Sequence, residues 1–148
     1  EVKAYSVEVA FGHGAAEVDY VVPLGRIKAG EYGYVYHDIQ QALYRKPEKG
    51  IFKVILETGA LSDEEIVQTI HVLNELPIDF YKTSTGFKYP GASEHAAALI
   101  MAHKRADIAL KVSGGIASID DAERYIALGA TRLGASRLLK ACLEASAK

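Results

Sequence analysis

Cysteine, tryptophan and long apolar runs are scarce or absent in this sequence of 148 residues, which has one cysteine and no tryptophan. Cys142, expected to pack within the last helix, cannot form an intrachain disulfide, so we expect a reducing, cytoplasmic compartment. No apolar stretch approaches the roughly 20 residues of a membrane span, and no signal peptide is visible. Because the sequence begins at Glu1 and its single methionine is Met101, we expect a start that was trimmed, processed or cut from a longer protein.

The sequence also lacks an excess of charge of one sign, with 17 basic against 19 acidic residues. A net charge of -2 gives no electrostatic reason to expect binding to nucleic acid or to a membrane surface. There is no Walker lysine motif, and Gly12-His13-Gly14 follows an expected helix rather than a strand, unlike a dinucleotide fingerprint. We expect neither a metal nor another cofactor, because no metal-ligand spacing joins His13, His37, His71, His95 and His103.

Short apolar runs alternate with amphipathic stretches along the chain, in which 49% of the residues are hydrophobic. These runs have the length and composition of strands that a parallel sheet buries on both faces. We expect five such strands, at Glu17–Val22, Phe52–Leu56, Phe80–Thr83, Ala109–Val112 and Thr131–Gly134.

Helix signals lie between these strands. Ser62 and Ser118 each precede acidic residues that suit a first helical turn, and Ser93 should cap a helix over Glu94–Arg105. Gly129 should end the helix that Ser118 begins. The segment Gly30–Tyr44 is ambiguous, because its tyrosines alternate as in a strand while its aliphatic residues have helical spacing. We favour the helix.

The alternation of strand and helix predicts an α/β fold with parallel strands and right-handed crossovers. Polar residues and glycines at the ends of strands favour a (β/α) barrel of the TIM type, in which the carboxyl ends of strands carry the chemistry. Such a barrel needs eight strands and about 250 residues. We therefore expect residues 1–148 to form a single, partial TIM-barrel domain of about five βα units.

Two lysines end neighbouring strands of this predicted sheet. Lys82 ends the segment Asp79–Lys82 and is followed at once by hydroxyls and Gly86, although a side chain that reaches for solvent would explain it equally well. Lys111 stands at the corresponding place one strand and one helix later, so both should lie at a similar height. Two close ammonium groups should depress each other's pKa, which predicts a neutral, nucleophilic amine at Lys82.

Two acidic residues accompany the lysines. Asp19 lies inside the apolar run Ala16–Val22 and needs a partner there. Alternate strands of a barrel contribute to one interior layer, so Asp19 and Lys82 can face each other, as a buried ion pair or as part of a proton relay. Glu57 ends the intervening strand, and we expect it to be structural rather than catalytic.

Glycine-containing loops follow the last three predicted strands. Glycine lets the backbone approach a ligand, and the helix that follows presents free N–H groups to an anion. Loops after the last two strands bind phosphate in many barrels of this type, although simple turn chemistry is the alternative. Together the loops predict a phosphate site that includes Gly86, Gly114, Gly115, Gly134 and Ser136.

With these residues identified, the sequence resembles the deoxyribose-phosphate aldolase family almost from end to end. The most specific shared element is Lys82–Gly86, and the other elements match in order and spacing. The matching segments are Ala16–Asp19, Lys53–Gly59, Asp79–Phe87, Lys111 with Gly114–Ile116, and Gly129–Ser136.

The resemblance implies a class I aldolase on a TIM barrel, without a metal, in which this chain supplies strands 4–8 and the first three strands are absent. It implies reversible cleavage of 2-deoxy-D-ribose 5-phosphate into D-glyceraldehyde 3-phosphate and acetaldehyde. Lys82 would be the Schiff-base lysine, Lys111 the neighbour that lowers its pKa, and Asp19 part of the proton relay. One departure concerns the phosphate site, because Arg137 stands where a second small polar residue is common.

Other functions remain open from the residues alone. The Schiff base could serve a different substrate, as in other lysine aldolases or transaldolases. The chain could also be a non-catalytic phosphate-binding or assembly module, or an incomplete piece of an aldolase. Five parallel strands leave two open edges, so a companion segment or a second copy in a homo-oligomer would be needed to close the sheet.

Overall fold

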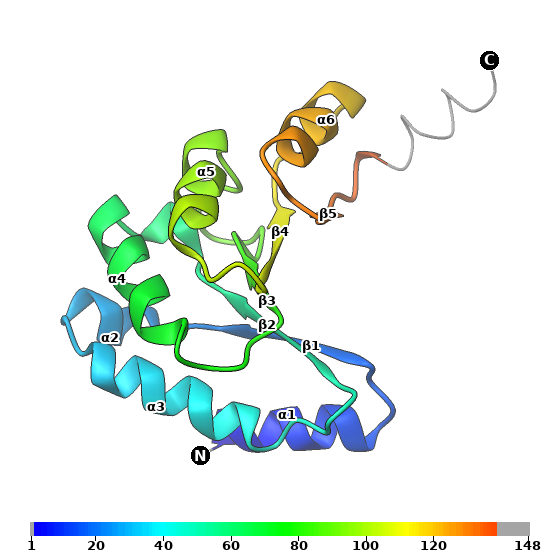
Figure 1. Cartoon of the computed structure of the whole chain (residues 1–148). Helices are drawn as coiled ribbons and strands as arrows, with labels where there is room; N and C mark the ends of the chain where they lie inside the picture. The colour runs from blue at the N-terminus through cyan, green and yellow to red at the C-terminus, as the bar shows by residue number, and fades with distance from the viewer. Residues whose placement is uncertain (1, 139–148) are drawn as a thin grey trace.

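The computed structural model describes residues 2–138, which contain one sheet of five parallel strands. The strands are neighbours in the order in which they occur along the chain (Figure 1). Each begins and ends within one residue of its predicted bounds, so the parallel α/β prediction is confirmed. The strands are β1 (Glu17–Val21), β2 (Ile51–Ile55), β3 (Phe80–Lys82), β4 (Ala109–Ser113) and β5 (Arg132–Gly134).

Helices connect the strands and follow one another around the outside of the sheet (Figure 1). Among the major helices, α1 packs on α3, α3 on α4, α4 on α5 and α5 on α6. This succession of packed helices outside a parallel sheet is the arrangement of a TIM-type barrel seen over part of its circumference. The helices are α1 (Val2–Gly12), α2 (Leu24–Lys28), α3 (Tyr32–Leu43), α4 (Asp63–Leu73), α5 (Glu94–His103) and α6 (Ile119–Ala127), with a short 3-10 turn η1 (Thr58–Ala60).

Serine caps begin three of the helices, as the sequence predicts. The Ser62 side chain accepts from Glu65 N while the Glu65 carboxylate accepts from Ser62 N, which forms a capping box at the start of α4. Ser118 and Asp121 form the same arrangement at α6, and Ser93 accepts from Ala96 N at α5. The helix α5 ends two residues earlier than expected. Cys142 lies outside the described residues.

The segment with alternating tyrosines is helical, as favoured from the sequence. In α3 the residues Val35, Ile39 and Ala42 recur at helical spacing and are fully buried. Burial of that face outweighs the preference of tyrosine for strands, because packing of an apolar face supplies most of the stability of a helix in a protein. The helix α2 has only five residues and was not predicted.

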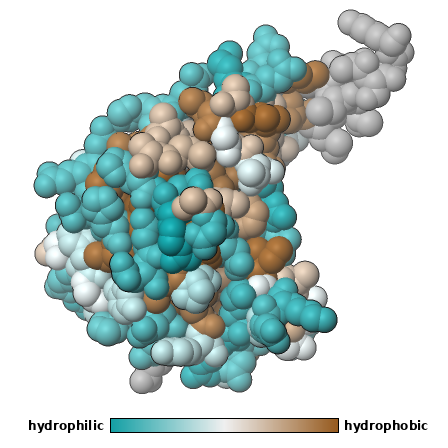
Figure 2. Space-filling view, viewed as in Figure 1, coloured by the Kyte–Doolittle hydropathy of each residue, from teal (hydrophilic) through white to brown (hydrophobic). Residues whose placement is uncertain are grey.

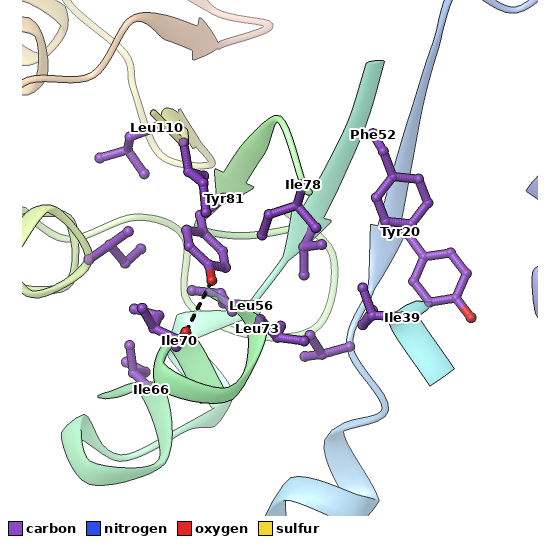
Figure 3. Packing of buried hydrophobic residues seen from close by; sticks show 14 of the residues in the cluster. Tyr20, Ile39, Phe52, Leu56, Ile66, Ile70, Leu73, Ile78, Tyr81 and Leu110 are labelled. Atoms are coloured by element: carbon purple, nitrogen blue, oxygen red, sulfur yellow. Dashed lines mark hydrogen bonds between the residues drawn. The ribbon is translucent and has the colours of Figure 1, made fainter. Parts of the chain in front are cut away.

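Buried side chains between the sheet and the helices form a continuous core (Figure 3). Tyr81 on β3 is fully buried, and its hydroxyl donates to Ile70 O on α4 at 3.2 Å. Tyr20 and Phe52 pack ring against ring on neighbouring strands, with centroids 5.5 Å apart. The side of the molecule seen in Figure 2 is largely hydrophilic, with hydrophobic side chains gathered toward the end where α6 lies.

Alternation along each strand gives the sheet two different faces. One face packs against the helices and carries Tyr20, Phe52, Tyr81 and Leu110. The opposite face carries the charged residues Glu17, Asp19, Lys53, Lys82, Lys111 and Arg132, which hydrogen-bond to one another. In a barrel this second face is the interior, so the fold gathers the charged residues of the strands at the place where barrel enzymes build their sites.

Candidate active site

The three residues predicted to be catalytic meet on the inner face of the sheet. Lys82 and Lys111 are register partners on β3 and β4. Lys82 Nζ lies 2.7 Å from Asp19 Oδ2, and Lys111 Nζ lies 3.3 Å from the same oxygen. Asp19 extends from β1, two strands away from β3, as expected if alternate strands contribute to one interior layer. The two amines therefore lie within about two hydrogen-bond lengths of each other.

A third lysine, which the sequence interpretation missed, holds the other side of Asp19. Lys53 Nζ on β2 lies 2.8 Å from Asp19 Oδ1 and 2.7 Å from Glu17 Oε2, and its side chain is only 4% exposed. Glu17 in turn pairs with Arg132 on β5. The first and last strands of the described sheet are thus joined by an ion pair, and the chain of charges runs across the whole inner face.

Burial and the charges on this face shift the pKa values of Asp19 and Lys111. Burial would raise the pKa of Asp19, but hydrogen bonds from Lys53 and Lys82 and the charges of Lys82 and Lys111 outweigh it and hold that pKa well below its usual range. Burial lowers the pKa of Lys111, and the Lys82 charge adds to the effect while Asp19 opposes it. Asp19 is therefore a carboxylate at neutral pH, and Lys111 loses its proton more readily than a free lysine.

A cavity of about 430 Å³ opens beside the two lysines. Lys82 and Lys111 line it, together with all five residues predicted to bind phosphate, which are Gly86, Gly114, Gly115, Gly134 and Ser136. The structure therefore brings the predicted catalytic lysines and the predicted anion-binding loops to one site, and Asp19 joins it through its hydrogen bonds to the lysines. Thr85 and Arg137 also line the cavity.

Two of the cavity-forming loops are in direct backbone contact. Ala92 N donates to Gly114 O at 3.1 Å, and a Cβ atom at Gly91 would lie 2.5 Å from the carbonyl carbon and oxygen of Gly114. Gly114 itself has φ +90°, a conformation that other residues adopt only with strain. The loop after β3 and the loop after β4 therefore pack closely only because glycine stands on both sides.

Glu57 holds the loop that follows β3. Its buried carboxylate accepts from Thr85 N at 3.1 Å and from the Thr85 hydroxyl, and its backbone has φ 54°. Among residues 2–138 it is the single non-glycine residue with a positive φ. Glu57 thus contacts Thr85 in the cavity wall and not the two lysines, which agrees with the structural role expected for it. By holding Thr85, it fixes the position of one wall of the cavity.

Lys53, Glu17 and Arg132 had a recognisable signal in the sequence. Each is a charged residue inside or beside a short apolar strand, as Asp19 is. An ammonium at Lys53, between Phe52 and Val54, needs a buried partner for the same reason that Asp19 does.

Within residues 2–138 no group of three or more His, Cys, Asp or Glu side chains is arranged to hold a metal ion. In the same part of the chain, no helix has the length and apolar character required to cross a bilayer.

Comparison with known proteins gives a consistent result. The family model of the DeoC/LacD family aldolases matches residues 1–144. Deoxyribose-phosphate aldolase of Clostridium perfringens (strain SM101 / Type A) is 42% identical over 142 residues, which are 96% of this chain and 63% of that protein. Its counterpart in Enterococcus faecalis (strain ATCC 700802 / V583) is 42% identical over 136 residues, which are 92% of this chain and 62% of the relative. The chain thus spans somewhat less than two thirds of the length of these curated relatives.

Solved structures agree with the sequence matches. A structure described as "QR15, an Aldolase" has a TM-score of 0.89 and 32% identity, covering 99% of this chain and 67% of that one. The deoxyribose phosphate aldolase from Aeropyrum pernix, described as having a unique tetrameric structure, has a TM-score of 0.75 and 27% identity, covering 98% of this chain and 60% of its own. These matches support the prediction that the five strands form part of a TIM-type barrel.

Proposed function

The chain belongs to the DeoC/LacD family of aldolases, and from this premise we propose that it catalyses the reversible cleavage of 2-deoxy-D-ribose 5-phosphate into D-glyceraldehyde 3-phosphate and acetaldehyde. One observation supports this reaction above all others. Two lysine amines share a single carboxylate oxygen beside a cavity lined by glycine loops. Such a cluster can supply an amine nucleophile, a proton relay and an anion site together.

Lys82 is the proposed nucleophile. Its neutral amine attacks the aldehyde carbon of the open-chain sugar phosphate, and loss of water gives a cationic imine on Nζ. Lys111 contributes a second positive charge at the same Asp19 oxygen, which disfavours protonation of the attacking amine. The imine then draws electrons from the C2–C3 bond as that bond breaks.

Asp19 is proposed to relay protons through a water molecule. Removal of the proton from the C3 hydroxyl turns C3 into the aldehyde carbon of D-glyceraldehyde 3-phosphate, and the electron pair of the C2–C3 bond forms an enamine on Lys82. Protonation of the enamine at C2 and addition of water then release acetaldehyde and regenerate the amine. Acid–base assistance of this kind is worth about 10²–10⁴-fold in rate.

The phosphate of the substrate is proposed to bind at the far side of the cavity from Asp19. Backbone N–H groups in the loops that contain Gly86, Gly114, Gly115 and Gly134 can approach an anion closely, and Ser136 adds a hydroxyl. No metal or organic cofactor takes part in these steps.

Completion of the barrel is part of the proposal. The strands β1 and β5 are the two edges of the described sheet, and each leaves a row of backbone groups to pair. We propose that a companion segment or a second copy of the chain, as in a homodimer, covers these edges. We further propose that the enzyme acts in the cytoplasm in the breakdown of deoxyribonucleotides.

Reductive trapping tests the central step. The chain is incubated with acetaldehyde and sodium borohydride, and peptide mapping locates the alkylated lysine. We expect the label on the peptide that contains Lys82 and none above background in Lys82→Ala, while Lys28→Ala, which removes an exposed lysine outside the cavity, stays labelled. Undiminished labelling of Lys82→Ala would contradict the assignment. Product analysis with acetaldehyde as donor and different acceptors then separates this reaction from that of another Schiff-base aldolase.

A further inference from the structure

Arg132 starts from the same level of the sheet as the two lysines of the site. It is the register partner of Lys111 on β4, which in turn is the partner of Lys82 on β3. Register partners project to the same face at a similar height, so three cationic side chains begin in one row. Both lysines of this row reach Asp19. The side chain of Arg132 is long enough to reach the same carboxylate.

The guanidinium of Arg132 instead extends toward the amino-terminal end of the sheet. It donates a hydrogen bond to Glu17 Oε2 on β1, two residues before Asp19. Its central carbon lies 4.9 Å from the centre of the ring of Phe80, which is on β3 two residues before Lys82. Arg132 therefore crosses the inner face below the two lysines, away from the cavity that they line.

Glu17 also shares the buried Lys53 with Asp19. Lys53 Nζ lies 2.7 Å from Glu17 Oε2 and 2.8 Å from Asp19 Oδ1. Hydrogen bonds from Lys53 and Arg132 lower the pKa of Glu17, so its side chain is a carboxylate at neutral pH. One oxygen of Glu17 thus contacts two cations of the inner face, while Asp19 Oδ2 is contacted by the two amines of the site.

We propose that Glu17 is a positioning residue, which holds Arg132 away from Asp19 and so keeps that carboxylate available to the two lysines. This inference rests on the proposed aldol reaction and adds a residue that acts through its neighbours. An arginine competes strongly for a carboxylate, because its planar guanidinium can donate two parallel hydrogen bonds to it. Without the charge of Glu17, Arg132 should turn to Asp19 and displace the amines from it.

Kinetics of Glu17→Gln test this role, because glutamine keeps the size of the side chain without its charge. The kcat for 2-deoxy-D-ribose 5-phosphate should fall roughly tenfold to a hundredfold, since a carboxylate bound by arginine accepts a proton poorly. The KM should stay within about twofold, because other residues line the cavity. The acid limb of the pH–rate profile should move to lower pH, because the inner face has lost one negative charge.

Removal of Arg132 as well should restore most of the rate. In the double variant Glu17→Gln/Arg132→Gln the competitor is gone and the net charge of the inner face is that of wild type. Its kcat should return to within about threefold of wild type, and its acid limb should return to nearly the wild-type pH. Arg132→Gln alone should be milder than Glu17→Gln. If the pair served stability alone, the two single variants would be equally slow and the double variant would be no faster than either.

Two further variants guard this comparison. Glu17→Asp keeps the charge on a shorter side chain and should fall between wild type and Glu17→Gln in both kcat and pH dependence. If Glu17→Gln fails to fold, Glu17→Asp with and without Arg132→Gln makes the same comparison. Glu31→Gln breaks the exposed pair of Glu31 with Arg26 and should change neither kcat nor the pH–rate profile.

A crystal structure of Glu17→Gln gives a readout that does not need catalysis. It should show the guanidinium of Arg132 within about 3 Å of a carboxylate oxygen of Asp19. If the wild-type chain does not cleave the sugar phosphate, the proposed reaction fails, and the crystal structure still decides what Glu17 holds in place. An Arg132 side chain that stays beside Phe80 in this variant would overturn the inference, as would a double variant as slow as Glu17→Gln.

Discussion

Lys82 and Lys111 are register partners on adjacent parallel strands, and their Nζ atoms converge on one carboxylate oxygen of Asp19. Partners in a parallel ladder project to the same face, so the sheet itself fixes this pair. Six charged residues form the network around them, four of them basic and two acidic: Glu17, Asp19, Lys53, Lys82, Lys111 and Arg132. The network therefore carries an excess of positive charge, which favours an anionic ligand on the inner face.

Replacement of Lys111 by leucine should lower the activity of the enzyme without lowering its stability. In the proposed mechanism the charge of Lys111 keeps the attacking amine neutral, so Lys111→Leu should lower kcat at least about tenfold at neutral pH and move the acid limb of the pH–rate profile to higher pH. Burial lowers the pKa of Lys111, which means that folding disfavours its charged form. The free energy of unfolding at pH 7 should therefore be unchanged or larger in the variant.

Steady-state rates across pH and urea unfolding check this pair of effects. If the variant is slower but the acid limb of its pH–rate profile lies at the same pH as in wild type, the two lysines are not electrostatically coupled. A large loss of stability would show that Lys111 acts mainly through its ion pair with Asp19.

Substitution of Asp19 by asparagine should remove part of the acid sensitivity of the fold. The folded-state pKa of Asp19 lies below the ordinary value of 3.8, so its ionised form stabilises the native chain at pH values above about 3.8. That contribution is lost as the pH falls further, through the depressed folded-state pKa. In Asp19→Asn this contribution is absent at every pH, so the variant should be less stable than wild type at pH 7 and the difference should shrink toward pH 3.

Urea unfolding of wild type and Asp19→Asn at pH 7, 5, 4 and 3 measures that difference. Parallel stability curves for the two proteins would contradict the assignment of the acid-sensitive contribution to Asp19. The same variant should lose about 10²–10⁴-fold in kcat, because its amide cannot accept the relayed proton.

Loss of Lys53 should be costly because two carboxylates depend on it. In Lys53→Met the buried ammonium that contacts both Asp19 and Glu17 is replaced by an apolar chain of similar length, which leaves the two carboxylates with one partner fewer. Removal of one partner from a buried ion pair costs about 3–5 kcal/mol, and the partial exposure of both carboxylates places the expected loss at about 2–4 kcal/mol.

The matched control is Lys28→Met, which breaks the exposed pair of Lys28 with Glu65 on the helical side of the molecule. An exposed pair is worth at most about 1 kcal/mol, so this variant should unfold at nearly the wild-type urea concentration. Similar losses in the two variants would mean that the Lys53 network has no special role in stability.

The sequence predicted the strands and the two lysines because both follow from local patterns. Each strand is a short apolar run, and each lysine stands at the end of one, so alternation of strand and helix was enough to bring Lys82 and Lys111 together. The glycine loops followed from the same rule, because they come directly after β3, β4 and β5. The helix α3 was predictable because its aliphatic residues recur at helical spacing, which indicates a buried helical face. Its alternating tyrosines alone would have indicated a strand.

The partners of Asp19 could not be assigned fully from local patterns. Asp19 is paired in register with Lys53 on β2, and that register depends on how residues 22–50 fold between the two strands. The ion pair between Glu17 and Arg132 joins residues 115 positions apart, which depends on the curvature of the whole sheet. The contact of Gly91 with Gly114 is similar, because nothing in either loop indicates how closely the other will approach.

That contact between loops yields the last prediction, with a glycine control inside the same chain. A Cβ atom in Gly91→Ala would lie 2.5 Å from backbone atoms of Gly114, which cannot move aside as a flexible side chain could. Relief of this overlap must separate the two loops, at an expected cost of about 1–3 kcal/mol in stability. Since Gly114 lines the cavity, the KM for the phosphorylated sugar should rise as well.

The control is Gly33→Ala, in which the new atom lies in α3 with open space around it. This variant should instead stabilise the chain by about 0.5–1 kcal/mol. Thermal unfolding and substrate kinetics of both variants measure these effects, and a Gly91→Ala variant with wild-type stability and KM would show that the two loops tolerate a wider separation than their packing implies.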